Sequence, residues 1–135
     1  MKYDKYKSKA EVIEAIRKDH PEIRTAKQAE KYLRTILPLE SHYQTRIIKH
    51  IKKLRPDAFV WKVASGEYSR GGIPDICAII DGNYYGFEVK RPFIGEVTDL
   101  QRKTIEAIRR AGGRACVVCC PAEAEDFLKE GGAVT

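Results

Sequence analysis

Residues 71–90 read GGIPDICAIIDGNYYGFEVK, and this stretch decides the fold. Two runs rich in β-branched and aromatic residues flank Asp81-Gly82. An Asp-Gly pair between such runs is typical of a hairpin with a two-residue turn. We therefore predict a buried strand over 76–80 and a partner strand over 84–90.

The register of this hairpin decides which side chains meet. With a two-residue turn, Asp75 lies directly across from Glu88, and the two Cβ atoms are about 5 Å apart. Lys90 follows Glu88 by two positions and so shares its face of the strand. Phe87 and Val89 point to the opposite face, toward a core. The sequence thus gathers an aspartate, a glutamate and a lysine at one end of the predicted sheet.

Facing carboxylates repel each other, so a fold that places two side by side must protonate one of them or supply a cation. Asp75 and Glu88, with the backbone carbonyl of Val89, suit Mg²⁺ or Mn²⁺, because these hard cations prefer oxygen ligands. Lys90 beside the ion can position a water or stabilise charge on a phosphate. A metal also lowers the pKa of its bound water and holds a phosphodiester for in-line attack. This pattern predicts metal-dependent phosphodiester hydrolysis.

The alternative interpretation is a hairpin whose charged face is solvated. For Glu88 and Lys90 alone this interpretation is favoured, because Glu-X-Lys is common on exposed strands. Asp75, in Ile73-Pro74-Asp75, lies across the tight turn from Glu88, and this third charged residue favours a functional site over a solvated face. Gly71-Gly72 also permits a close approach of the backbone to a ligand.

Helical patterns surround the hairpin. Capping-box patterns that begin at Ser8 and Thr25 start two short helices, and His20-Pro21 ends the first of them. We predict further helices and strands over the ranges 39–54 (helix), 58–63 (strand), 98–111 (helix), 114–120 (strand) and 122–130 (helix), with a flexible loop over 65–72. This order predicts an α/β fold with a mixed sheet flanked by helices. We divide the chain into a helical N-terminal extension, 1–37, and a second domain, 38–135.

Two further polar residues have competing interpretations. Gln101 shares the apolar face of its helix with Ile105, which would direct it into a site. It is also the third helical position of a capping box that begins at Thr98, and the two roles are equally supported.

Glu40 lies in the first turn of its helix, where an acid favours the helix dipole. Its basic, apolar-striped helix is the reason to place Glu40 at the site.

The charge is distributed unevenly along the chain. The 135 residues carry a formal net charge of +6 and are 43% hydrophobic, which fits a folded chain of about one domain. Residues 1–37 and 38–70 each carry +4, whereas residues 71–100 carry −3. Basic flanks around an acidic centre favour a polyanionic partner and a bound cation. The predicted DNA-binding residues are Arg46, Lys49, Lys53, Lys62 and Arg70.

Composition also excludes several classes of protein. The sequence has no run of the roughly 18–20 apolar residues that span a membrane and no apolar segment typical of a secretory signal. We therefore expect a cytoplasmic protein with no membrane partner.

Cys116 and Cys119 form a C-x-x-C pattern, which invites a zinc or redox interpretation. Positions i and i+3 of a strand point to opposite faces, so we instead expect the four cysteines, including Cys77 and Cys120, to be small buried hydrophobes.

Taken together, these motifs resemble the PD-(D/E)xK nuclease superfamily, and within it the VRR-NUC (virus-type replication-repair nuclease) domain most closely. The resemblance covers about residues 38–130. The matching segments are Gly72-Ile73-Pro74-Asp75, Phe87-Glu88-Val89-Lys90, Leu100-Gln101 at the start of a helix, Glu40 with Tyr43-Gln44, and Gly112-Gly113-Arg114 before an apolar strand.

The resemblance implies a nuclease of α/β/α architecture that uses Mg²⁺ or Mn²⁺ and no small-molecule cofactor. Asp75 and Glu88 would bind the metal, and Lys90 would act on the nucleophilic water. Glu40 would be an accessory ligand, direct or through water, and Gln101 would order the site. Stand-alone members resemble Holliday-junction resolvases and tend to be homodimers. A lone small domain resembles phage or bacterial members, which implies the cytoplasm of a bacterial or phage-infected cell.

The predicted function is a metal-dependent DNA endonuclease that acts on branched DNA, such as Holliday junctions, in replication, recombination or repair. One alternative is a restriction-type, sequence-specific nuclease on the same fold, for which a chain of this size leaves little room for base-reading elements. The other is a basic DNA-binding module without catalysis, which would need Lys and Arg but no clustered carboxylates.

Overall fold

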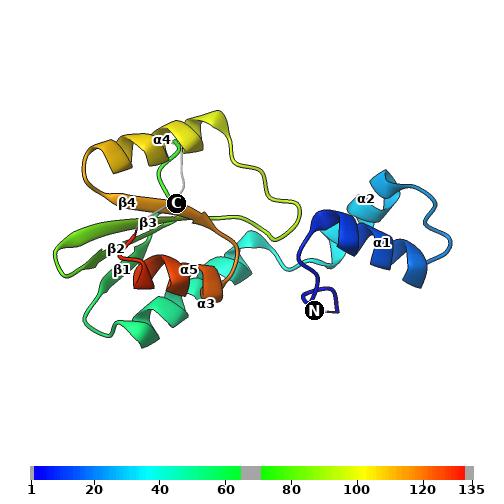
Figure 1. Ribbon diagram of the computed structural model, residues 1–135, viewed down its shortest axis with the longest axis horizontal. Helices are drawn as coiled ribbons and strands as arrows, with labels where there is room; N and C mark the ends of the chain where they lie inside the picture. The colour runs from blue at the N-terminus through cyan, green and yellow to red at the C-terminus, as the bar shows by residue number, and fades with distance from the viewer. Residues whose placement is uncertain (1, 65–70, 133–135) are drawn as a thin grey trace.

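The computed structural model describes residues 2–64 and 71–132, and the helices and strands occur in the predicted order (Figure 1). They are α1 (Lys9–Asp19), α2 (Ala26–Ile36), α3 (Glu40–Leu54), β1 (Phe59–Lys62), β2 (Ile76–Ile80), β3 (Asn83–Val89), α4 (Asp99–Arg110), β4 (Arg114–Val118) and α5 (Pro121–Lys129). Each element from α3 onward ends within two residues of its predicted bounds. Residues 65–70 of the predicted loop lie outside the described residues.

The four strands form one mixed sheet in the order β1-β2-β3-β4. The first two pairings are antiparallel, and β3 pairs with β4 in parallel. Within the hairpin, Ile76 pairs with Phe87, which is the predicted register. Asp81 and Gly82 have φ of 53° and 79°, as a two-residue type I′ turn requires. The Asp-Gly turn therefore fixes which residues of β2 and β3 face each other.

Helices cover both faces of the sheet. In Figure 1, α3 and α5 lie on one face and α4 on the other. The main hydrophobic core includes Phe87 and Val89 of β3, Ile47 and Ile51 of α3, and Phe127 of α5. Phe87 and Val89 are fully buried, which confirms that they face the core. The other face of β3 is left for Glu88, on the side where α4 lies.

The N-terminal helices have a smaller apolar cluster of their own, at one end of the molecule in Figure 1. It contains Val12 and Ile16 from α1 and Leu33 from α2. Ile94, which follows β3 in the sequence, is also part of it. The cluster is therefore completed by a residue from beyond the proposed boundary at residue 37, and the division into two domains stays a prediction.

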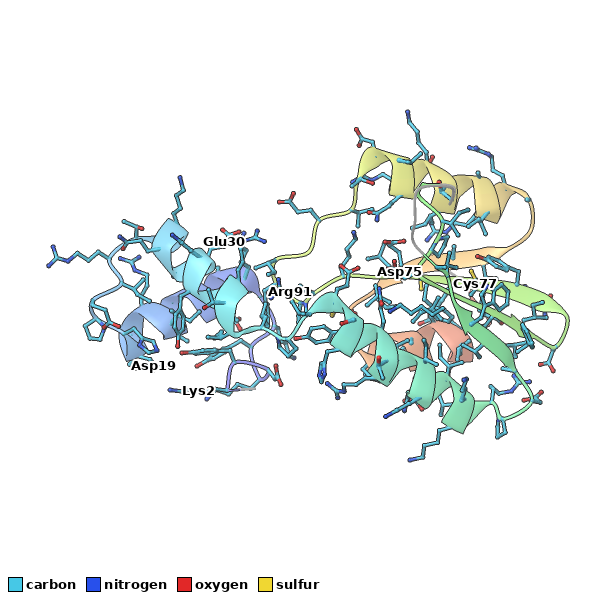
Figure 2. The ribbon with its side chains drawn as sticks, turned by 180° about the vertical axis from the view of Figure 1, so that it is seen from behind. Lys2, Asp19, Glu30, Asp75, Cys77 and Arg91 are labelled. Atoms are coloured by element: carbon cyan, nitrogen blue, oxygen red, sulfur yellow. The ribbon has the colours of Figure 1, made fainter. Side chains whose placement is uncertain are left out.

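Arg91 connects the N-terminal helices to the sheet (Figure 2). Its guanidinium donates hydrogen bonds to the carbonyls of Arg34 at 2.9 Å, Leu37 at 3.0 Å and Pro38 at 3.0 Å. These carbonyls belong to the last turn of α2 and to the link into α3. A cation at the C-terminal end of a helix interacts favourably with its dipole. One side chain next to β3 thus holds both the end of α2 and the approach to α3.

We expect Arg91→Ala to lower the free energy of unfolding by about 1–3 kcal/mol, because three carbonyls lose a charged donor. Chemical denaturation measures the loss, and hydrogen exchange should show faster exchange of the α2 amides. Arg102→Ala is a suitable control, since Arg102 is exposed and its guanidinium bonds, among the described residues, to nearby Asp99 and the carbonyl of Val97. Unchanged α2 exchange in Arg91→Ala would contradict this role.

No helix among the described residues is both long and apolar enough to cross a membrane.

Candidate active site

Glu88 is a buried carboxylate in the last part of β3. Its residue exposure is 1%, so the interpretation of Glu88 and Lys90 as a solvated hairpin face is wrong. One carboxylate oxygen, Oε1, accepts a hydrogen bond from Gln101 Nε2 at 2.7 Å and lies 3.7 Å from Lys90 Nζ. The other, Oε2, is buried and has no hydrogen-bond partner among the described residues. A buried carboxylate oxygen without a partner is costly unless a ligand satisfies it.

The electrostatics of Glu88 are equally unusual. Burial, together with the negative charge of Asp75, raises the pKa of Glu88 to about 8. Lys90 opposes this shift, and Glu40 adds to it. Like charges and burial both disfavour the ionised carboxylate, and a bound cation relieves both effects. The donor set at this place therefore fits a hard divalent cation.

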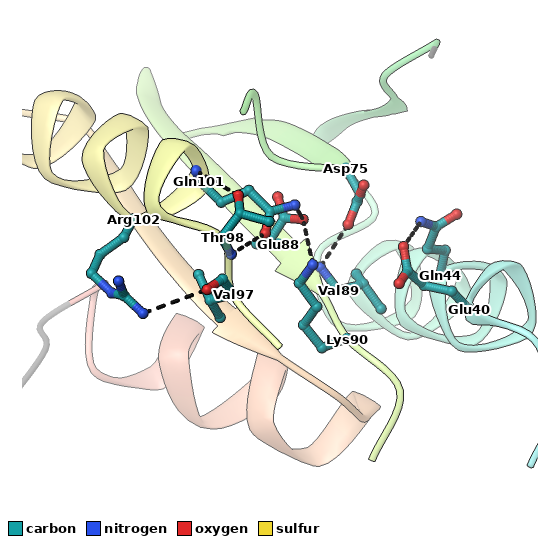
Figure 3. Close-up of polar contacts among 10 residues, drawn as sticks. All are labelled: Glu40, Gln44, Asp75, Glu88, Val89, Lys90, Val97, Thr98, Gln101 and Arg102. Carbon is teal, nitrogen blue, oxygen red and sulfur yellow. Dashed lines mark hydrogen bonds and ion pairs between the residues drawn. The ribbon is translucent and has the colours of Figure 1, made fainter. Parts of the chain in front are cut away.

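Asp75 is held in place by its two neighbouring strands. Its Oδ2 accepts the backbone N–H of Val89 at 2.8 Å, and its carbonyl accepts the N–H of Val63 at 2.8 Å. Figure 3 shows Asp75 between Glu88 on one side and Glu40 on the other. The structure thus brings Asp75 and Glu88 together as the hairpin register predicts. The N–H of Val89, which the sequence did not point to, fixes the aspartate, and a carboxylate retains acceptor capacity after one such bond.

Lys90 provides the positive charge of the site. Its side chain is 15% exposed and its Nζ lies near the Glu88 carboxylate rather than in open solvent. The chain beyond it is fixed by Arg91, and its own N–H donates to the carbonyl of Val118 at 3.0 Å. The ammonium is therefore positioned from a rigid strand end, next to the acidic pair.

Glu40 approaches the site from the first turn of α3. Its Oε1 accepts a 3.4 Å hydrogen bond from Gln44 Nε2. Burial raises the pKa of Glu40, and the charge of Asp75 raises it further. Within residues 2–64 and 71–132, the carboxylates of Glu40, Asp75 and Glu88 are not all within 4.8 Å of one another. Glu40 is therefore an outer acid, and this placement suits the water-mediated form of its predicted role.

Gln101 both caps α4 and points into the site, the two roles that its local sequence supported equally. Its side-chain oxygen accepts the N–H of Thr98 at 3.0 Å, and Thr98 Oγ1 accepts the N–H of Gln101 at 3.1 Å. This is a complete capping box. The amide nitrogen of the same side chain donates to Glu88 at 2.7 Å. The cap therefore fixes the amide so that its NH₂ group faces the buried carboxylate.

A second capping box makes this dual role testable. Gln28 occupies the same position in the complete box of α2. We expect Gln28→Ala to cost about 0.5–2 kcal/mol, because it removes one cap, and Gln101→Ala to cost more, because it also removes the amide donor of the buried Glu88 carboxylate. Only Gln101→Ala should change how much Mn²⁺ raises the melting temperature. Equal Mn²⁺ responses of the two variants in thermal unfolding would show that Gln101 acts only as a cap.

The predicted DNA-binding residues lie in two places. Three are exposed on α3, opposite its buried residues: Arg46, Lys49 and Lys53. Lys62 is exposed at the end of β1, and its charge slightly opposes the rise in the pKa of Glu40. Arg70 lies outside the described residues.

The glycine pair before Asp75 lies against α4. Gly72 has φ of 83°, and a Cβ there would lie 2.7 Å from Thr104 Oγ1 and 2.8 Å from Leu100 Cγ. A Cβ on Gly71 would also contact Leu100, at 3.0 Å. The backbone therefore approaches α4 closely, and the pair allows this helix to pack beside the site; the expected close approach to a ligand stays a prediction.

Comparisons with known proteins support the same fold. No protein-family model matches the chain, and no curated protein matches it. A solved structure described as a VRR_NUC domain is similar, with a TM-score of 0.53 and 22% sequence identity. The match covers 64% of this chain and 95% of that structure. The chain therefore has a VRR-NUC-like fold, as its motifs predicted, with a mixed sheet flanked by helices and helical residues before it.

Proposed function

We propose that this protein is a metal-dependent nuclease that hydrolyses phosphodiester bonds in DNA. The observation that carries the proposal is Glu88, a fully buried carboxylate with one oxygen that has no hydrogen-bond partner in the described part of the chain. It lies beside Lys90 and next to a second acid, Asp75, on a fold that resembles VRR-NUC domains. A purely structural ion pair gives no reason for an unsatisfied oxygen at this position, whereas a cation site does.

The residues present fit Mg²⁺ or Mn²⁺. Asp75, Glu88 and the Val89 carbonyl would hold the ion, with Glu40 reaching it through water. Such an ion lowers the pKa of a bound water and neutralises charge on a phosphate. Gln101 orients Glu88 and the N–H of Val89 orients Asp75, so both acids are preorganised. Lys90, within reach of this pair, would position the attacking water and stabilise negative charge that develops on the phosphate.

The basic residues of α3 and β1 would bind the DNA backbone. Arg46, Lys49, Lys53 and Lys62 are exposed and offer ammonium and guanidinium groups to phosphates. Contacts to phosphates do not distinguish one base sequence from another, and they weaken steeply as the salt concentration rises. Affinity for DNA should therefore fall with salt concentration and show little dependence on sequence.

The substrate we propose is branched DNA, cut by a homodimer in the cytoplasm of a bacterial or phage-infected cell. A four-way junction has two equivalent strands to cut, and a two-fold symmetric pair of sites matches that geometry. A cleavage screen over a linear duplex, a flap and a four-way junction tests this proposal. We expect symmetric paired nicks in the junction. Discrete fragments from linear duplex alone would instead indicate a restriction-type nuclease.

The exposed basic side of α3 supports a second candidate, a module that binds DNA without cutting it. Such a module would bind all three DNAs and give no product with Mg²⁺ or Mn²⁺. The same screen, run with a gel-shift assay in parallel, separates the two functions.

A further inference from the structure

A second cluster of metal-ligand side chains lies at the turn between β4 and α5, outside the candidate active site. Cys119 and Cys120 form this turn, and Glu123 lies in the first turn of α5. Glu123 Oε1 accepts the N–H of Cys119 at 2.7 Å, which folds its carboxylate back toward the two cysteines. Cys120 is the N-cap residue of α5, but its side chain makes no capping hydrogen bond. Its thiol is therefore not used to start the helix.

The ligand atoms of this cluster are close together. Sγ of Cys119, Sγ of Cys120 and a carboxylate oxygen of Glu123 all lie within 4.8 Å of one another. No other trio of His, Cys, Asp or Glu in the described parts of the chain meets this spacing. Two ligand atoms on one tetrahedral Zn²⁺ are about 3.5–3.8 Å apart, given Zn–S of about 2.3 Å and Zn–O of about 2.0–2.2 Å. Small side-chain rotations would bring the trio to that distance.

The cluster lines a cavity of about 590 Å³ that also has His42 of α3 in its wall. The His42 imidazole does not belong to the group within 4.8 Å, so its side chain would have to turn toward the trio to act as a fourth ligand. His42 lies two residues after Glu40 in the first part of α3. A cation bound here would connect the β4–α5 turn to the helix end that carries the outer acid of the candidate active site.

The other two cysteines belong to the apolar interior, as predicted. Cys77 is 3% exposed, and Cys116 packs against the main core. Burial raises the pKa of Cys116 and also that of Cys119, so it is the place of Cys116 against the main core, not its titration, that sets it apart. The prediction of buried hydrophobes does not extend to Cys119 and Cys120, because β4 ends at Val118 and the chain turns into the cavity. The pair that meets is thus Cys119 with Cys120, not the C-x-x-C pair.

We propose that Cys119, Cys120 and Glu123 form a binding site for a thiophilic divalent cation of the Zn²⁺ class, with His42 available as the fourth ligand. Thiolate ligands select soft or borderline ions, whereas the carboxylates of the candidate active site select Mg²⁺ or Mn²⁺. The two sites therefore take different metals, and either one can be present without the other.

The test is titration of the reduced, metal-free full chain with Cd²⁺ and Zn²⁺. Binding of Cd²⁺ to thiolates is followed by its ultraviolet charge-transfer absorption, and Zn²⁺ affinity by competition with a chelating dye. We expect about one ion per chain and a rise in melting temperature. Cys119→Ser and Cys120→Ser should each lower Zn²⁺ affinity at least about a hundredfold. Glu123→Gln, at an exposed position where folding is not at risk, should lower it about tenfold.

Two variants serve as controls. Cys116→Ala removes a thiol of the C-x-x-C pattern outside the trio and should leave the Cd²⁺ absorption and the affinity unchanged. Asp75→Asn alters the candidate active site and should also leave them unchanged, so failure of one site does not mimic failure of the other. The proposal is overturned if no thiolate absorption develops, or if Cys116→Ala weakens binding as much as Cys119→Ser does.

Discussion

Asp75→Asn is expected to lower Mn²⁺-dependent cleavage of DNA at least about a hundredfold while the protein stays folded. The asparagine oxygen can still accept the N–H of Val89, which the carboxylate accepts at 2.8 Å. The fold of the site is therefore kept, and only the negative charge that would bind a cation is lost. Single-turnover cleavage of a labelled DNA measures the loss, and circular dichroism shows whether the fold is retained.

Asp81→Asn is the matched control for this experiment. Asp81 lies at the other end of β2, in the hairpin turn, and its side chain is largely exposed. Its φ of 53° is in the left-handed region, which asparagine tolerates well. The same chemical change should therefore leave cleavage at the wild-type rate. Wild-type cleavage by Asp75→Asn itself would show that the proposed site is wrong.

Glu88→Gln is expected to abolish cleavage and, in the metal-free protein, to raise the free energy of unfolding by about 1–3 kcal/mol. The wild-type chain buries a carboxylate whose ionised form is disfavoured by burial and by the charge of Asp75, and a neutral amide at the same place has no charge to bury. In Mn²⁺ the wild type should instead be the more stable of the two proteins, because the ion stabilises only the protein that retains the carboxylate. Thermal unfolding of both proteins in EDTA and in Mn²⁺ measures the crossover.

The stabilising effect of Glu88→Gln should depend on pH. In the folded protein, burial raises the pKa of Glu88 from an ordinary 4.5 to about 8. The folded wild type therefore binds a proton more tightly than the unfolded chain and loses stability as pH rises between these two values. The advantage of the glutamine variant should grow across this range and level off above it. Glu106→Gln, at an exposed position of α4, should show no such trend; an equal trend would contradict the assignment to Glu88.

The hairpin shows how far sequence could predict the site. The Asp81-Gly82 turn fixes the register, and the period of two along a strand then places Asp75 across from Glu88. The burial of Glu88 could not be predicted in this way. It depends on how α4 packs on the sheet. The local sequence around Gln101 supports a role as a cap of that helix as well as a role in the site. Only the packed structure shows that one amide does both.

The contacts of Arg91 and of the cysteines could not be predicted from local sequence patterns. Arg91 bonds carbonyls that are more than fifty residues earlier in the chain, and no spacing rule connects them. The C-x-x-C spacing drew attention to Cys116 and Cys119, but the end of β4 separates them. The turn that follows brings Cys119, Cys120 and Glu123 together, and the position of that turn is set by the strand's pairing in the sheet.

The claim that Asp75, Glu88 and Lys90 hydrolyse DNA with a bound metal is tested most directly on the wild-type protein. End-labelled linear duplex and four-way junction are incubated with the protein in Mg²⁺, in Mn²⁺ and in EDTA, and the products are separated on a denaturing gel. We predict cut strands of the junction with Mg²⁺ or Mn²⁺ and intact DNA in EDTA. Intact DNA under every condition, or cleavage that persists in EDTA, would contradict the claim.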